Sequence, residues 1–224
     1  MEKVIHIIPT PIGNLEDITL RAIRLLKESD IILAEDTRKT KKLLNHYQIN
    51  TKMSSYHMFN EHKKLNLIID QIKSDLKISL VCDAGMPGIS DPGFLLIREC
   101  IRNNIKIICL PGPTACINAI VQSGLPSNKF NFVGFLPTKR GRKKMLNEIV
   151  DYKNTTIIYE SPHRILKTLG DLSLICPLRD VVVLKELTKI HETTYRGNIE
   201  DVILEISKSK IKGEFVIVLD GKPN

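Results

Sequence analysis

The sequence predicts an α/β protein with two domains. In the first half of the chain, short β-branched runs alternate with segments whose apolar residues recur at helical spacing, which is typical of βα units. Near Gly124 and Pro126 this alternation stops, and strands and helices then follow in a mixed order. With 224 residues, the chain is long enough for two domains that each bury a core. We therefore expect an N-terminal domain over residues 1–122 and a C-terminal domain over residues 123–224.

The N-terminal domain is expected to hold a mostly parallel sheet. Asp17 or Thr19 can cap a first helix, whose apolar stripe runs through Leu20, Ile23 and Leu26. A second clear helix is expected within residues 59–75. Continuously apolar strands that alternate with helices indicate a parallel sheet covered on both faces. The expected strands are residues 3–8, 30–35, 77–82 and 105–111.

The C-terminal domain is expected to hold a mixed sheet. Only "TKIH" separates its second and third expected strands, so these two are predicted to be antiparallel neighbours. The expected strands are residues 155–160, 180–187, 192–197 and 213–220, and the expected helices are residues 141–150, 162–169 and 199–207.

Turn residues mark the carboxyl ends of the N-terminal strands, where ligands bind in parallel sheets. These turns read "PTPIGN", "EDTRKT", "DAGMPG" and "PGPTA", and we expect them to converge on one crevice. Gly85 and Gly88 permit positive φ and close backbone approach, whereas Pro87 and Pro92 remove N–H donors. Such a loop lacks the pattern of a nucleotide-phosphate loop and suits a neutral or cationic ligand.

The turn "PGPTA" sets Thr114 and Ala115 at the start of a helix, where free N–H groups can hold a carboxylate. In the alternative interpretation, these loops are tight βα turns and nothing more, and Thr114 is a helix cap.

Composition narrows the class of protein further. Five cysteines form no Cys-x-x-Cys pair, so we expect reduced thiols and no metal site. No apolar run approaches the roughly 18 residues of a membrane span, and no secretory signal opens the chain, so a cytoplasmic protein is expected. The net charge of +8 fits an anionic partner such as nucleic acid, or equally an AT-biased coding sequence that enriches lysine.

Eight motifs follow one another along residues 10–221: "TPIGNLEDITLRA", "AEDTRKTKKLL", "DAGMPGISDPG", "LPGPTACINAI", "GFLPTKRGRKK", "YESPHR", "KELTK" and "GEFVIVLDG". This ordered set closely resembles the ribosomal RNA small subunit methyltransferase I family of the tetrapyrrole-methylase superfamily. "EDTR" and "ESPHR" distinguish this family from the precorrin and uroporphyrinogen methylases and from diphthine synthase, which share mainly the glycine–proline loops.

The resemblance implies two α/β domains of the tetrapyrrole-methylase type, with S-adenosylmethionine bound in the cleft between them, and a homodimer. It implies as substrate the 2′-hydroxyl of a decoding-region cytidine in 16S rRNA of the small ribosomal subunit. Mapped by motif, the cofactor-binding residues are Ile12, Asp83, Gly85, Met86, Ile89, Thr114, Ala115, Tyr159, Leu187 and Glu214.

Methyl transfer to a ribose hydroxyl is an in-line displacement. Positioning can contribute about 7–11 kcal/mol to such a reaction, whereas a general base adds about 10²–10⁴-fold. Glu35 or Glu160 could accept the hydroxyl proton, and Arg38 or Lys189 could lower its pKa. Asp36 and His163 are further candidates. Alternatively, Asp36–Arg38 and Glu160–Arg164 are structural ion pairs that brace their turns.

The basic run "TKRGRKK" is the candidate RNA-binding element. A solvated loop is the default for an isolated basic run, but the resemblance favours contacts to phosphate. Phe130, Phe132 and Phe135 offer stacking surfaces nearby, or else are buried strand residues. The candidate phosphate contacts are Lys139, Arg140, Arg142, Lys143 and Lys144.

Two other functions remain open from the sequence. One is a tetrapyrrole C-methyltransferase of the precorrin or uroporphyrinogen type, against which the basic run argues because tetrapyrroles are small. The other is a non-catalytic ribosome-binding factor with the same fold. Members of the resembled family often continue beyond the last strand, and this chain stops at "DGKPN", so RNA recruitment is expected to use the second domain and the dimer surface.

Overall fold

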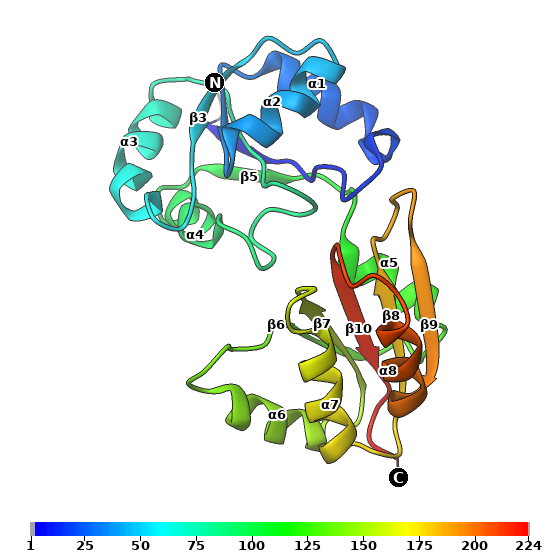
Figure 1. Ribbon diagram of the computed structural model, residues 1–224. Helices are drawn as coiled ribbons and strands as arrows, with labels where there is room; N and C mark the ends of the chain where they lie inside the picture. The colour runs from blue at the N-terminus through cyan, green and yellow to red at the C-terminus, as the bar shows by residue number, and fades with distance from the viewer. Residues whose placement is uncertain (1–2, 224) are drawn as a thin grey trace. The chain divides into compact units, whose positions relative to one another are not determined.

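The computed structural model describes residues 3–223, and the chain divides into two compact units between Thr114 and Ala115 (Figure 1). This division falls before helix α5 (Ala115–Ser123), whereas the sequence had suggested a boundary near the end of this helix. The reason is that α5 packs on strands of the second unit, with Cys116, Ala119 and Ile120 buried. The break near Gly124 therefore marks the end of a helix.

The first unit holds a five-stranded, fully parallel sheet, which confirms the predicted fold class. Ile5 pairs with Ile78 on one side and with Ile107 on the other, so the first strand is interior. The edge strand β3 was not predicted, because three of the four residues in "KMSS" are polar. The order is β3-β2-β4-β1-β5, with β1 Val4–Ile7, β2 Ile31–Ala34, β3 Lys52–Ser55, β4 Ile78–Leu80 and β5 Lys106–Cys109.

Helices cover both faces of this sheet (Figure 1). One core contains Ile68 and Leu96 from α3 and α4, and the other contains Leu26 and Leu43 from α1 and α2. Thr19 caps α1 as predicted, because its hydroxyl accepts the Ala22 N–H at 3.0 Å. The elements are η1 Leu15–Asp17, α1 Leu20–Glu28, α2 Thr37–His46, α3 Glu61–Lys73 and α4 Phe94–Arg102.

The second unit holds a mixed five-stranded sheet in the order β6-β7-β10-β8-β9. The β6–β7 pair is parallel, and the other pairs are antiparallel, including the predicted β8–β9 neighbours. The strands are β6 Phe130–Phe135, β7 Thr155–Glu160, β8 Asp180–Lys185, β9 Thr193–Asn198 and β10 Phe215–Leu219.

The central strand β10 is buried on both faces. Phe215, Ile217 and Leu219 pack in the core formed with the three helices α6, α7 and α8. The alternate residues Val216 and Val218 are also buried, on the face toward α5. The helices are α6 Arg142–Asp151, α7 Ile165–Ile175 and α8 Ile199–Ser207. Within residues 3–223, no helix has the length and apolar character that crossing a bilayer requires.

Candidate active site

Two of the predicted loops are joined by backbone hydrogen bonds at the top of the first sheet. The Thr10 N–H donates to the Gly85 carbonyl, and the Gly85 N–H donates to the Thr10 carbonyl, each at 2.9 Å. The Thr10 hydroxyl also donates to the Cys82 carbonyl at 3.1 Å. The loop after β1 is therefore fixed against the loop after β4.

A third loop, after β5, packs against both. A Cβ atom on Gly112 would lie 2.7 Å from Cγ of Pro9, so only glycine allows this approach. A Cβ atom on Gly85, which has a φ of +82°, would meet Ile12 Cγ2 at 3.4 Å and the Pro113 carbonyl oxygen at 3.8 Å. The three loops predicted to converge thus contact one another around Gly85.

The fourth loop, which leads into α2, is joined to the others by Asp83. The Asp83 carboxylate accepts the Asp36 N–H at 2.9 Å and the Lys39 ammonium at 2.7 Å. The side chain of Asp83, a predicted cofactor contact, is therefore directed toward α2.

The remaining predicted cofactor residues of the first unit follow in the same loops. Met86 Sδ lies 3.6 Å from Cys109 Sγ, and Ile89 is exposed. The Thr114 hydroxyl donates to the Gly112 carbonyl at 3.3 Å and so stiffens the turn before α5.

Burial changes the acidity of two carboxyl groups near these loops. Burial, and then the negative charge of Asp83, raise the pKa of Glu35. Burial, followed by the charge of Glu35, raises the pKa of Asp91 to about 6. Glu35 was predicted as a proton acceptor, whereas Asp91 was missed. The only feature of the sequence that pointed to Asp91 is its position as the second acidic residue of the glycine–proline loop "DAGMPGISDPG".

Asp36 is a weaker candidate for a base than the sequence suggested. Its carboxylate accepts hydrogen bonds from the Arg38 side chain at 3.0 and 2.7 Å, which hold the pKa of Asp36 well below its usual range. Its Oδ1 also caps α2 through the Arg38 N–H at 2.9 Å. The structural ion pair that the sequence left open is therefore formed.

In the second unit, Tyr159 is brought to the start of α5. Its hydroxyl accepts the Cys116 N–H at 3.0 Å, next to Ala115, and its ring packs edge-on against Phe132 and Phe135. Both phenylalanines belong to β6, and Phe135 remains 54% exposed. Two predicted cofactor residues of this unit, Tyr159 and Ala115, are thus neighbours.

Lys189 is held between two glutamates in the same unit. Its ammonium donates to Glu186 at 2.7 Å and to Glu214 at 2.9 Å. Burial opposes protonation, but these hydrogen bonds outweigh it and raise the pKa of Lys189, so this residue is a stable cation. Leu187, which lies between Glu186 and Lys189 in the sequence, is buried.

The prediction that Glu160 accepts a proton is corrected by its position. Glu160 is only 2% exposed, and its carboxylate is bound by Arg164 at 2.8 Å, by the Ser161 N–H at 2.7 Å and by the Thr168 hydroxyl at 2.7 Å. These partners leave it a structural role at the end of β7. The alternative interpretation of Glu160–Arg164 as a bracing pair is confirmed.

The prediction that Arg142 contacts phosphate is also corrected. Arg142 is 8% exposed, and its guanidinium donates to Asp171 at 3.0 and 2.7 Å and to Thr168 at 3.0 Å. It anchors α6 to α7 instead. The other four residues of the basic run are exposed: Lys139, Arg140, Lys143 and Lys144.

Comparison with known proteins defines the class. Residues 4–203 match the model of the Tetrapyrrole (Corrin/Porphyrin) Methylases. A uroporphyrin-III C-methyl transferase from Thermus thermophilus, solved in complex with S-adenyl homocysteine, has a TM-score of 0.65 at 17% identity, covering 97% of both chains. The chain therefore belongs to this class of methylases and has their fold.

Relatives with greater identity are narrower in type. A ribosomal RNA small subunit methyltransferase I from Halalkalibacterium halodurans is 48% identical over 97% of this chain and 75% of its own. One from Thermotoga maritima is 44% identical over 99% of this chain and 100% of its own. The chain belongs to the ribosomal RNA small subunit methyltransferase I family.

Membership in this family confirms S-adenosylmethionine as the cofactor, and the loops around Gly85 fit it. The groups beside Gly85 are the apolar side chain of Ile12 and the carbonyl oxygen of Pro113, which are compatible with an apolar base and a sulfonium. Asp83 and Asp91 lie in the loop after β4, and Glu35 lies in the loop between β2 and α2. Carboxyl groups in these loops favour a cationic ligand. Within residues 3–223, no group of three or more metal-ligating side chains is arranged to hold a metal ion.

The raised pKa of Asp91 predicts how stability depends on pH. Because about 6 lies above the ordinary value of 3.8, the folded chain keeps a proton that the unfolded chain releases between these values. The free energy of unfolding should therefore fall as pH rises from about 4 to about 6. Asp91→Asn should remove this loss and stabilise the first unit at pH 8 by about 1–2 kcal/mol, after a discount for solvent screening.

Urea unfolding of wild type and variant at pH 4 and pH 8 measures the difference. Asp70→Asn, on the exposed surface of α3, is the matched control because it makes the same substitution away from these loops, and it should change the free energy of unfolding little. An equal effect of Asp91→Asn at both pH values would contradict the assignment.

Proposed function

We propose that this chain is an S-adenosylmethionine-dependent methyltransferase of 16S rRNA, and that it methylates the 2′-hydroxyl of a decoding-region cytidine in the small ribosomal subunit. The observation that carries the proposal is the 42–48% identity, over nearly the whole chain, to relatives named ribosomal RNA small subunit methyltransferase I. The likeness to solved tetrapyrrole enzymes, at 15–17% identity, supports the fold alone and does not favour a tetrapyrrole substrate.

In this proposal, the loops around Gly85 hold the cofactor chiefly by shape. S-adenosylmethionine supplies an electrophilic methyl group on a cationic sulfur. The Thr10–Gly85 bridge and the Gly112 contact fix the loops before the cofactor binds, so little freedom is lost on binding. Tyr159, Leu187 and Glu214 are the proposed contacts from the second unit.

Among the carboxylates, Glu35 is the proposed proton acceptor. Its raised pKa brings it nearer to the working pH than an ordinary carboxylate, which makes it a better base. Arg38 and Lys189 are the proposed cations that stabilise the developing alkoxide. Arg38 is well suited because its side chain is 89% exposed although it pairs with Asp36.

For RNA binding, the proposal uses the four exposed residues of the basic run. Lys139 and Arg140 precede α6, and Lys143 and Lys144 lie in its first turn. We further propose that the protein works as a homodimer in the cytoplasm, where its substrate is assembled.

The direct test is methylation of small subunits isolated from a strain that lacks this gene. We expect the purified chain, given S-adenosylmethionine, to add one 2′-O-methyl group at one cytidine of the 16S rRNA, as mapped by mass spectrometry of nuclease fragments. Transfer to a porphyrinoid instead would support the tetrapyrrole enzyme. Failure to bind S-adenosylmethionine in calorimetry would support the non-catalytic factor.

The cofactor loops yield a second prediction. Gly85→Val should raise the Kd for S-adenosylmethionine at least about tenfold, because its side chain would enter the space bounded by Ile12 and Pro113. Gly124→Val is the matched control, since it has a similar positive φ of 75° but no atom within 4 Å of its added Cβ. Equal calorimetric affinities for the two variants would reject the role of Gly85.

The basic run yields a third prediction. Changing Lys139, Arg140 and Lys143 to Ala should make the RNA-binding constant less dependent on salt. The negative slope of its logarithm against log salt should become shallower by about 2–3, at about 0.7–0.9 per phosphate contact. Affinity for S-adenosylmethionine should stay the same. A triple variant of the exposed Lys208, Lys210 and Lys212 removes equal charge elsewhere in the second unit. An equal change of slope in both variants would indicate that the basic run is a solvated loop without a specific role in RNA binding.

A further inference from the structure

Helix α2 differs from the other helices of this chain in its charge. It contains Arg38, Lys39, Lys41 and Lys42 but no carboxylate. Every other helix between residues 3 and 223 that carries basic residues also carries at least one Asp or Glu. Opposite charges therefore offset one another within those helices, but not within α2.

The basic residues of α2 lie on its solvent-exposed side. Leu43 and Leu44 are buried in the core beneath the helix. Lys41 and Lys42 follow Arg38 by three and four residues, spacings that place the three side chains on one side of a helix. We call the exposed positions of this helix the α2 basic face: Arg38, Lys39, Lys41, Lys42, Asn45 and His46.

Only part of this charge is neutralised within the first unit. Arg38 and Lys39 each pair with an aspartate at 2.7 Å. None of the ion pairs formed within residues 3–223 involves Lys41 or Lys42. In the part of the chain that the structure describes, these two cations are therefore available to an anion from outside.

The placement of these charges is unfavourable for the helix itself. The amino end of a helix carries a partial positive charge, so cations near it destabilise the helix. Arg38 is also close enough to Lys41 and Lys42 for like charges to repel. Residues that break such a local rule are typical of functional sites. An anion bound on the α2 basic face would relieve this repulsion.

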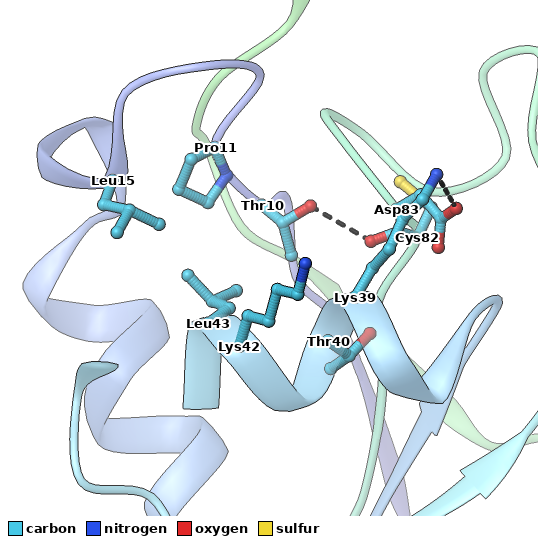
Figure 2. A pocket seen from close by; sticks show the side chains of 9 residues that line it. All are labelled: Thr10, Pro11, Leu15, Lys39, Thr40, Lys42, Leu43, Cys82 and Asp83. Carbon is cyan, nitrogen blue, oxygen red and sulfur yellow. Dashed lines mark hydrogen bonds and ion pairs between the residues drawn. The ribbon is translucent and has the colours of Figure 1, made fainter. Parts of the chain in front are cut away.

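The α2 basic face borders the loops of the candidate active site. In Figure 2, the side chains of Lys39 and Lys42 extend from α2 toward Asp83 and Thr10, and these four residues line one pocket. Thr10 forms the backbone bridge to Gly85. A ligand bound along α2 would thus lie beside the loops that are proposed to hold the methyl donor.

The composition of the α2 basic face favours one kind of partner. The face has no aliphatic side chain and no aromatic one other than the His46 imidazole, because the leucines of α2 are already packed in the core. A stable protein partner usually requires an apolar centre in the interface, and a helix that lies on a membrane inserts an apolar face. Backbone phosphates of RNA require only cations and N–H donors, which this face supplies.

We propose that the α2 basic face binds backbone phosphates of the rRNA substrate, with Lys41 and Lys42 as the principal contacts. This inference rests on the proposed function, and it adds an RNA-binding surface in the first unit to the basic run of the second. Such contacts fix the position of the RNA without reading its sequence.

The test compares two double variants that remove equal charge. Lys41→Gln with Lys42→Gln changes the α2 basic face, whereas Lys63→Gln with Lys73→Gln changes exposed residues of α3, which packs on the other face of the sheet. For protein-free 16S rRNA, the α2 double variant should raise Kd at least about tenfold at about 0.1 M salt. The negative slope of log K against log salt should become shallower by about 1–2. The α3 double variant should change both quantities little.

Two further measurements separate RNA binding from a structural role. The affinity of the α2 double variant for S-adenosylmethionine in calorimetry should equal that of wild type. Its Tm should equal or exceed that of wild type, because the substitutions remove two like charges from the helix. A structural role of the two lysines would instead lower Tm. Equal changes of the salt slope in both double variants, or no change in either, would overturn the inference.

A photo-crosslinking amino acid at position 42 identifies the partner directly. With small subunits, we expect it to attach to 16S rRNA, whereas the same amino acid at position 63 should give little product. Attachment to a ribosomal protein would overturn the inference. An unchanged salt slope for RNA, together with lost binding to phosphatidylserine vesicles, would assign the face to a membrane surface and overturn it as well.

The outcomes separate the inference from the function beneath it. If wild type methylates no rRNA, the proposed function fails. If wild type is active but the α2 double variant keeps the Kd and the salt slope of wild type, only the inference fails.

Discussion

The first unit depends on the pair of backbone hydrogen bonds between Thr10 and Gly85. Each contributes about 1 kcal/mol net, but together they fix the distance between two loops that carry no other regular structure. Gly85 can make them because its φ of +82° is open to glycine at little cost. The approach of Pro9 to Gly112 and the contact of Ile12 with Gly85 follow from this register.

The same constraint orders the charges around the loops. Since the β4 loop is fixed, Asp83 lies where it can bind both the start of α2 and Lys39. Its negative charge then contributes to the raised pKa of Glu35, while the exposed Arg38 neutralises Asp36. Carboxylates with similar sequence surroundings thus receive different proton affinities from their hydrogen bonds and burial.

The fold was largely predictable, because apolar runs and glycine–proline turns report strands and their ends directly. The loops that meet around Gly85 were predictable for the same reason. The edge strand β3 was missed because three of its four residues are polar. The predicted domain boundary lay after α5 because the apolar face of this helix does not indicate which of the two sheets it covers. Side-chain partners distant in sequence were beyond prediction. Arg142 is held inside the protein by Asp171, and the Glu160 carboxylate accepts a hydrogen bond from Thr168.

The burial of Arg142 has a consequence for how homologous basic runs should be compared. Its planar guanidinium donates two hydrogen bonds to one carboxylate oxygen of Asp171 and a third to Thr168, a geometry that a lysine ammonium cannot reproduce. Substitution by lysine would keep the positive charge but would loosen the attachment of α6 to α7. The exposed lysines beside it carry no such restriction, so one motif combines a position constrained by shape with positions constrained by charge alone.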